Sequence, residues 1–328
     1  MTDRAAVLVT GGAGYIGSHV CKALSARGYL PVAFDNLIYG HEWAVKWGPL
    51  EVGDITDGAA LSDAIARHRP VAVVHLAAFA YVGESVEDPE KYYRNNLLGM
   101  LTLLSAVRGA DIRKFVFSSS CVVYGETDSD TISEDHSCDP VNPYGNTKYG
   151  GERMMRDFMQ AYGGSSVALR YFNAAGADPA GEIGEEHDPE PHLIPRVLDA
   201  ALDKDGGLTV FGENYETPDG TCVRDYIHVT DLADGHVKAL DMLDDASGQH
   251  VFNLGAGRGV SVLEMIDAAR RVTGADIPYD VGARRPGDPA RLIADTTLAR
   301  GMLKWEPGFS DIDTILETAW RWTQSRQD

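Results

Sequence analysis

The stretch Ala5-Ala6-Val7-Leu8-Val9-Thr10-Gly11-Gly12-Ala13-Gly14-Tyr15-Ile16-Gly17 decides the fold of this chain. Its apolar first half predicts a short buried strand, and the residues that follow the glycines predict a helix. Gly11, Gly14 and Gly17 allow a tight turn, a close approach of the backbone to a phosphate group, and close packing of the helix on its strand. The spacing is G-x-x-G-x-x-G, not G-x-G-x-x-G. We therefore expect an anion at the positive N-terminus of this helix.

A second predicted strand, Pro31–Phe34, ends at Asp35, 18 residues past Gly17. A carboxylate at this distance accepts hydrogen bonds from the adenosine ribose of a dinucleotide and repels a 2′-phosphate. Asn36 and Leu37 follow, so no adjacent arginine reverses that preference. The pattern favours NAD over NADP as the cofactor.

The same strand-and-helix alternation continues along the chain. Val71–Leu76, Phe115–Phe117 and Val167–Phe172 each predict a buried strand. This order predicts an α/β fold: a Rossmann-type, doubly wound parallel sheet with helices on both faces and ligands at the carboxyl ends of its strands.

The pattern changes after Phe172 to a Gly/Pro/Glu-rich loop and mixed short elements. We therefore expect residues 1–172 to form an NAD-binding domain, rejoined by a segment near 223–250. Residues 173–328 are expected to form a smaller, mixed α/β, substrate-binding domain that covers the cleft.

The segment from Ser118 to Lys148 carries the candidate chemistry. If Asn142 caps a helix that begins at Pro143, Tyr144 and Lys148 project from one face, one turn apart. The ammonium is then expected to lower the pKa of the phenol and make it a general base. The alternative is a surface Tyr and Lys on an ordinary helix, because Y-x-x-x-K also occurs by chance.

Composition limits the classes of function. The chain has 328 residues, 44% of them hydrophobic and 24% charged, with a formal net charge of −20. That acidity argues against a nucleic-acid surface. Four scattered cysteines show no C-x-x-C pair and no zinc-finger spacing to histidine, so we expect free thiols and no metal. No signal-peptide pattern or membrane-length apolar run is present, and we expect a cytoplasmic protein without a membrane partner.

Longer motifs distributed over almost the whole chain resemble the UDP-glucose 4-epimerases of the extended short-chain dehydrogenase/reductase superfamily. They are Thr10–His19, Val82–Val86, Phe117–Ser120 with Val123–Gly125, Arg170–Asn173, Val223–Val229, Asp231–His236, Asn253–Gly257, and Arg284-Arg285 with Gly287-Asp288.

The resemblance implies inversion at C4 of a UDP-hexose through a 4-keto sugar and a tightly bound NAD. Tyr144 would take the proton of the sugar 4-hydroxyl, Lys148 would lower the pKa of the tyrosine and hold the nicotinamide ribose, and Ser120 would hydrogen-bond the same sugar oxygen. These three residues form the expected catalytic set. No net oxidation results, so the NAD is expected to remain bound.

The resemblance also implies two binding sets. The expected cofactor residues are Gly11, Gly14, Tyr15, Ile16, Gly17, Asp35, Asn36, Asp54, Ile55, Leu76, Ala77, Ala78, Asn95, Ser118, Tyr144, Lys148 and Tyr171. The expected substrate residues are Ser120, Tyr144, Asn173, His192, Leu193, Val210, Phe211, Arg224, Arg285, Asp288 and Leu292. Arg224 and Arg285 would bind the diphosphate, which suits forked guanidinium groups, and Asp288 would bind the uridine ribose.

Three positions depart from the family pattern. Ala80 replaces a lysine that often contacts the cofactor, and His192 stands where well-known bacterial members have Asn. Leu292 replaces a tyrosine that commonly restricts the C2 side of the sugar, so we expect some tolerance of N-acetylhexosamines.

Other functions on the same scaffold remain open. A nucleotide-sugar dehydratase or decarboxylase would carry an acid soon after Ser120, whereas Cys121-Val122-Val123 has none. A UDP-xylose/UDP-arabinose epimerase is harder to exclude, and an NAD-sensing module would usually lack the tyrosine or the lysine.

The helix that begins near Tyr144 also predicts a contact surface. It carries Met154, Met155, Phe158, Met159 and Tyr162 at helical spacing. These side chains either join the chain's own core or form a homodimer interface with the helix near 92–107. We expect the homodimer, as the resemblance implies.

Overall fold

The computed structural model describes residues 4–127, 129–202, 207–285 and 289–326. Its larger part is built on a seven-stranded, fully parallel sheet in the order β10-β6-β5-β4-β1-β2-β3. The predicted Rossmann-type α/β fold is confirmed. The strands are β1 (Ala6–Thr10), β2 (Leu30–Asp35), β3 (Leu50–Val52), β4 (Ala72–His75), β5 (Lys114–Ser120), β6 (Ser165–Tyr171) and β10 (Gly248–Leu254).

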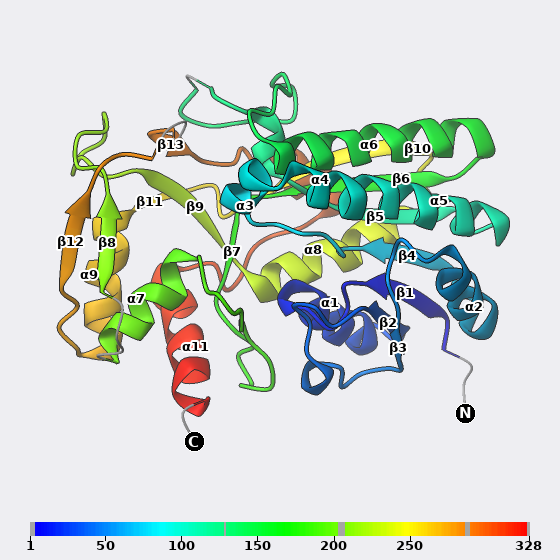
Figure 1. Cartoon of the computed structure of the whole chain (residues 1–328), viewed down its shortest axis with the longest axis horizontal. Helices are drawn as coiled ribbons and strands as arrows, with labels where there is room; N and C mark the ends of the chain where they lie inside the picture. Colours follow the sequence, from blue (N-terminus) through cyan, green and yellow to red (C-terminus); the bar gives the residue numbers. More distant parts are fainter. Residues whose placement is uncertain (1–3, 128, 203–206, 286–288, 327–328) are drawn as a thin grey trace.

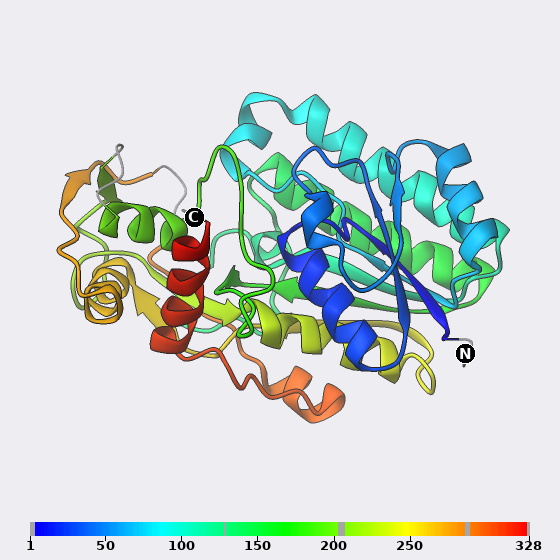
Figure 2. The same cartoon turned by 90° about the horizontal axis from the view of Figure 1, so that it is seen from below.

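Helices cover both faces of this sheet (Figure 1). On one face, α1 (Tyr15–Ala26) packs along α8 (Val229–Met242), which also contacts α10 (Thr297–Leu303); Figure 2 shows α1 and α8 side by side. On the other face lie α2 (Gly58–His68), α5 (Gly99–Gly109) and α6 (Pro143–Tyr162). Shorter helical segments are η1 (Glu42–Ala44), α3 (Val82–Glu87), α4 (Pro89–Tyr92), the π-helical η2 (Tyr93–Leu98) and η3 (Cys121–Tyr124).

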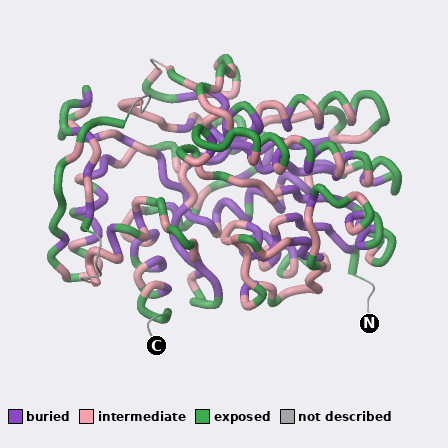
Figure 3. The backbone as a smooth tube through the Cα atoms, viewed as in Figure 1, coloured by how far each residue is buried: buried purple, intermediate pink, exposed green. Residues whose placement is uncertain are grey.

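Alternating side chains of β1 supply the cores of both faces. Val7 and Val9 pack with Leu24 of α1, whereas Leu8 packs with Leu61 of α2. All five side chains are completely buried, and Figure 3 shows the strands as the buried centre of the molecule. A strand covered on both faces needs apolar residues at every position, which explains its continuous apolar run.

The smaller part consists of short strands and three helices. Its main sheet contains β7 (Asn173–Ala175), β9 (Val223–His228), β11 (Gly259–Ser261) and β13 (Arg291–Leu292), and β8 (Leu208–Phe211) pairs with β12 (Tyr279–Gly282). The helices are α7 (Leu193–Ala201), α9 (Val262–Thr273) and α11 (Ile312–Ser325). Within the described ranges, every helix is too short or too polar to cross a membrane.

The chain returns from the smaller part to the large sheet through β9, α8 and β10. Buried Asp225 on β9 fixes this connection, because its carboxylate accepts from the backbone N–H groups of Ala256, Gly257 and Ala294 at 2.6–3.0 Å. Burial nevertheless raises the pKa of Asp225 to about 6. These hydrogen bonds tie β9 to residues that closely follow β10 and β13.

The glycine turn is packed too tightly for other side chains. A Cβ at Gly17 would lie 1.9 Å from the carbonyl oxygen of Gly11, and a Cβ at Gly11 would lie 2.7 Å from the amide nitrogen of Ala77. Gly11 also has a φ of +74°. The turn therefore requires glycine both for its backbone angle and for its contact with β1 and β4.

We predict that Gly17→Ala lowers the free energy of unfolding by about 1–3 kcal/mol and reduces copurified NAD, because the turn must shift to remove the overlap. Thermal unfolding and release of nicotinamide on denaturation measure both effects. Gly301→Ala is the matched control, since a Cβ there meets nothing within 4 Å and alanine favours its helix. Wild-type stability and NAD content in Gly17→Ala would contradict this account of the turn.

Candidate active site

A cleft of about 430 Å³ opens at the carboxyl ends of β1, β4, β5 and β6. It is lined by every expected cofactor residue except Asp54, and by four expected substrate residues outside that set, Ser120, Asn173, His192 and Leu193. The parallel sheet explains this convergence, since the carboxyl ends of parallel strands meet at one edge. Residues from segments that lie far apart in the sequence thus share one site.

Helix α6 and strand β5 position the candidate catalytic side chains. The Asn142 side chain accepts from the Gly145 N–H at 2.8 Å and Pro143 opens the helix, which confirms the predicted helix start. Lys148 Nζ donates to the Ser118 carbonyl oxygen at 2.7 Å and lies 5.7 Å from the centre of the Tyr144 ring. Tyr144 and Lys148 are both buried, which excludes the alternative of a surface pair.

The expected effect of Lys148 on Tyr144 is wrong for the chain by itself. Burial raises the pKa of Tyr144 to about 12, although hydrogen bonding with Ser120 opposes this rise. Burial also lowers the pKa of Lys148 to about 7. The lysine amino group is directed to the Ser118 carbonyl, and desolvation is the largest cause of the raised pKa of the phenol.

A buried ion pair lies close to Lys148, one turn further along α6, and the sequence analysis did not identify it. Glu152, one turn after Lys148 on α6, forms a bidentate pair with Arg170 of β6 at 2.7 and 2.9 Å. Both side chains are at most 6% exposed. Ser119 also donates to Glu152, and the Arg170 guanidinium lies 4.7 Å from the centre of the Tyr124 ring. The negative charge of Glu152 raises the pKa of Lys148, partly opposing its desolvation.

The cleft fits a dinucleotide at its glycine turn. A Cβ at Gly14 would contact only the Gly11 carbonyl, at 3.4 Å, so the backbone is open towards the cavity at the N-terminus of α1. Buried Asp35 is the last residue of β2, and the Ala13 and Leu37 N–H groups donate to its carboxylate at 3.0 and 2.9 Å. The helix terminus suits a diphosphate, and Asp35 suits a ribose.

Other expected cofactor residues have identifiable neighbours. Tyr15 donates from its hydroxyl to the Gly176 carbonyl at 2.6 Å, linking the glycine turn to the segment after β7. The Tyr171 hydroxyl is hydrogen-bonded to His236 of α8. Asp54 lies outside the cleft lining but accepts from Asn36, which does line it, at 2.9 Å. Asp54 therefore positions a cleft residue.

The other expected substrate residues that the structure describes lie outside the cleft lining. Arg224 is a register partner of Leu292, and Arg285 stacks over Phe211 with its guanidinium 4.2 Å from the ring centre. Neither these four residues nor Val210 line the cleft. Leu292 packs on a cluster that contains Cys121 and Phe172, two lining residues. Asp288 lies outside the described residues.

Sequence reasoning also missed part of the cleft wall. Tyr39, Phe79, Tyr81, Glu185 and His187 line it, although none was expected to do so. Tyr39, Phe79 and Tyr81 lie several residues after the ends of β2 and β4, so the sequence does not show that they line the cleft. The pattern His187-x-x-Glu190-x-His192 was the available signal for the other wall.

Comparison with known proteins gives a consistent result. The family model "NAD dependent epimerase/dehydratase family" matches residues 7–255. The UDP-glucose 4-epimerase of Rhizobium meliloti is 52% identical, with 98% of this chain and 97% of the relative covered.

Solved structures agree. A UDP-glucose 4-epimerase from Brucella ovis in complex with NAD is 53% identical, with a TM-score of 0.93 over 96% of this chain and 97% of that one. The UDP-Glc/GlcNAc 4-epimerase of Campylobacter jejuni is 35% identical, with a TM-score of 0.86 over 98% of this chain and 99% of that one.

We predict that Glu152→Gln lowers the free energy of unfolding by about 3–5 kcal/mol, because it leaves the Arg170 charge buried and unpaired. Urea unfolding measures the change. Glu90→Gln is the matched control: its ion pair with Arg94 joins side chains that are 72% and 70% exposed and should contribute about 0.3–0.5 kcal/mol. Equal losses in the two variants would show that the Glu152–Arg170 pair does not hold α6 on β6.

Proposed function

The chain belongs to the NAD dependent epimerase/dehydratase family, and we propose that it interconverts UDP-glucose and UDP-galactose by inverting C4 of the hexose. The observation that carries this proposal is the convergence of Ser120, Tyr144 and Lys148 on a cleft that begins at the glycine turn. The names of the similar proteins supply the sugar nucleotide.

Tyr144 and Ser120 have different roles at the C4 hydroxyl. Tyr144 exchanges a proton with the sugar 4-hydroxyl, and Ser120 hydrogen-bonds the same oxygen. NAD, when bound, supplies reversible hydride acceptance at C4. The pKa of about 12 keeps the proton on Tyr144 in the chain alone, so a positive charge that enters the cleft favours its removal.

The amino group of Lys148 has a fixed position in the site. Its Nζ is fixed on the Ser118 carbonyl, and the Glu152 carboxylate lies one turn away on α6. Inversion requires the 4-keto sugar to present its other face before the hydride returns.

Elimination chemistry is less well supported. Cys121 lines the cleft directly after Ser120, and burial raises the pKa of its thiol to about 12, so it stays protonated. Val122, the next lining residue, is apolar. The wall therefore offers no acid at the place where the dehydratases and decarboxylases of this scaffold need one.

We assign the UDP part of the substrate to the smaller region. Arg224 lies on β9 beside Leu292, and Arg285 is supported by the face of Phe211. Two guanidinium groups suit a diphosphate. Residues 1–172 with α8 and β10 would then hold NAD, and the rest of residues 173–328 would hold UDP and the sugar.

Two further assignments concern the environment of the chain. Met155 and Met159 of α6 belong to the chain's own core, whereas Tyr162 is 49% exposed on the same helix. Leu98 and Leu101 are also exposed on η2 and α5, and we propose that these helices form a homodimer face. A monomeric mass in solution scattering would contradict it. The free thiols of Cys21, Cys121 and Cys138 support a reducing cytoplasm.

We predict that Tyr144→Phe reduces the conversion of UDP-galactose to UDP-glucose, measured with no added reductant, by about 10²–10⁴-fold. The copurified NAD should remain, because the ring still fills its place. Tyr162→Phe, on an exposed part of the same helix, is the control and should keep full activity. Near-normal turnover by Tyr144→Phe would remove the phenol from the mechanism.

We predict measurable turnover of UDP-GlcNAc by the wild-type protein and selective loss of that turnover in Leu292→Tyr, because the larger ring narrows the C2 side of the sugar. Parallel kinetics with UDP-glucose provide the comparison and should change little. Leu298→Tyr, at an exposed position, is the control. Absence of UDP-GlcNAc turnover in the wild type would overturn this assignment of Leu292.

A further inference from the structure

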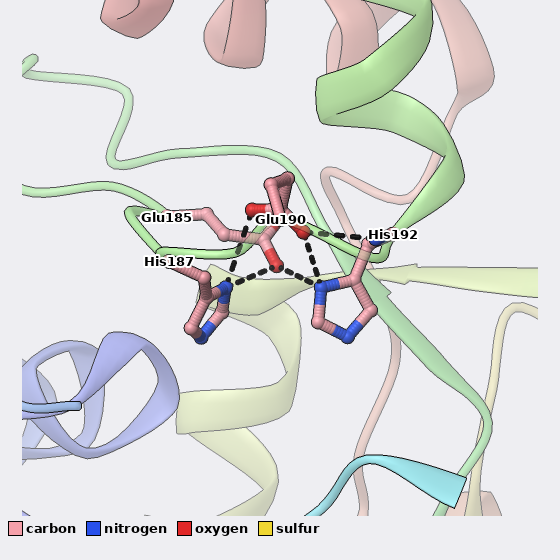
Figure 4. A group of neighbouring side chains, drawn as sticks. All are labelled: Glu185, His187, Glu190 and His192. Carbon is pink, nitrogen blue, oxygen red and sulfur yellow. Dashed lines mark hydrogen bonds and ion pairs between the residues drawn. The ribbon is translucent and has the colours of Figure 1, made fainter. Parts of the chain in front are cut away.

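Four metal-ligating side chains converge on one wall of the cleft. Glu185, His187, Glu190 and His192 come from the segment that joins β7 to α7, and Figure 4 shows both imidazoles directed at the two carboxylates. One ligand atom from each residue lies within 4.8 Å of all the others. We call these residues the His/Glu cluster.

The imidazole nitrogens and carboxylate oxygens of the cluster lie at separations close to those in a metal site. His187 Nδ1 lies 3.3 Å from both Glu185 Oε1 and Glu190 Oε2. His192 Nδ1 lies 3.0 Å from Glu185 Oε1 and 2.7 Å from Glu190 Oε1. A tetrahedral ion with ligands at about 2.0–2.1 Å places neighbouring ligand atoms roughly 3.3 Å apart. Both separations from His187 already have this value. The separations from His192 are shorter, and Glu190 faces the two imidazoles with different oxygens, so small side-chain movements would complete the arrangement.

The donor set also selects the ion. Two imidazole nitrogens and two carboxylate oxygens suit Zn²⁺ and similar divalent transition metals, whereas Ca²⁺ and Mg²⁺ prefer oxygen ligands throughout. With neutral imidazoles, the two carboxylates leave two negative charges on side chains that are only 10% and 16% exposed. One divalent ion balances that charge. The competing arrangement is two imidazolium–carboxylate ion pairs.

The backbone around the His/Glu cluster is held by the rest of the fold. The Glu185 carbonyl accepts from the Trp322 indole of α11 at 2.9 Å, and the Glu186 carbonyl is hydrogen-bonded to His41 at 3.2 Å. The His192 N–H donates to Glu190 at 2.9 Å. The ligands are therefore presented by a braced segment, as a preformed metal site requires.

From this geometry we propose that the His/Glu cluster binds one divalent transition-metal ion, with Zn²⁺ as the preferred occupant. The ion fixes the segment between β7 and α7 as a wall of the cleft, because Glu185, His187 and His192 all line the cavity. The His187 ring is 6.5 Å from that of Tyr15 at the glycine turn. The cysteine spacing predicted no metal, but this donor set contains no cysteine.

The test uses the full chain with its NAD, freed of any histidine tag, treated with chelator and then supplied with Zn²⁺ or Co²⁺. We expect one Zn²⁺ per chain after gel filtration, and an intense visible Co²⁺ spectrum typical of tetrahedral coordination. His187→Gln and Glu190→Gln should each bind at least about tenfold more weakly. The matched control is His250→Gln on β10, which should bind like the wild type; the His250 ring is hydrogen-bonded to the Ser247 carbonyl.

Circular dichroism verifies that each variant is folded. If His187→Gln does not fold, the more conservative Glu190→Gln and the Zn²⁺-dependent shift of the His187 and His192 imidazole NMR signals decide the question. The proposal is overturned if the wild type retains no Zn²⁺, if a folded Gln variant binds as tightly as His250→Gln, or if the two imidazole signals do not respond to Zn²⁺. These outcomes would leave the ion-paired arrangement and would not bear on epimerase activity.

Discussion

The hydrogen bond from Lys148 Nζ to the Ser118 carbonyl fixes the part of the structure on which the site depends. It joins the first turns of α6 to the carboxyl end of β5, and so sets Tyr144 beside Ser120. Because Lys148 is 4% exposed, water cannot replace this partner easily. Behind it, the Glu152–Arg170 pair holds the same helix on β6. The site therefore contains a buried lysine whose amino group has one fixed direction.

Burial gives the site its electrostatic character. It raises the pKa of Tyr144 and lowers that of Lys148, so both groups are shifted towards their uncharged forms. A bound cation reverses the balance for the phenol, because the nearby positive charge favours the phenolate. We therefore propose that the tyrosine acts as a base only in the occupied cleft. With a cation bound in the cleft, Tyr144 would lose its proton more readily than in the chain alone.

The sequence was most informative where the physics is local or follows from parallel strands. The glycine turn, Asp35 and the Asn142–Pro143 helix start each depend on neighbouring residues, and the structure places them as expected. The Tyr144 pKa could not be predicted from spacing, because it depends on burial by distant segments. The Glu152–Arg170 pair was missed for the same reason, because its two residues come from separate elements. The His/Glu cluster had a local signal in the spacing of His187, Glu190 and His192, but only the folded loop brings Glu185 to the same place.

Transfer of hydride at C4, with Tyr144 moving only the hydroxyl proton, is the central claim, and the fate of the C4 hydrogen tests it most directly. UDP-galactose labelled with deuterium at C4 should give UDP-glucose that retains the deuterium at C4, because a hydride held on bound NAD does not exchange with water. Mass spectrometry of the product in ordinary water measures this. Loss of the deuterium to solvent would show that C4 is deprotonated, and would contradict the account.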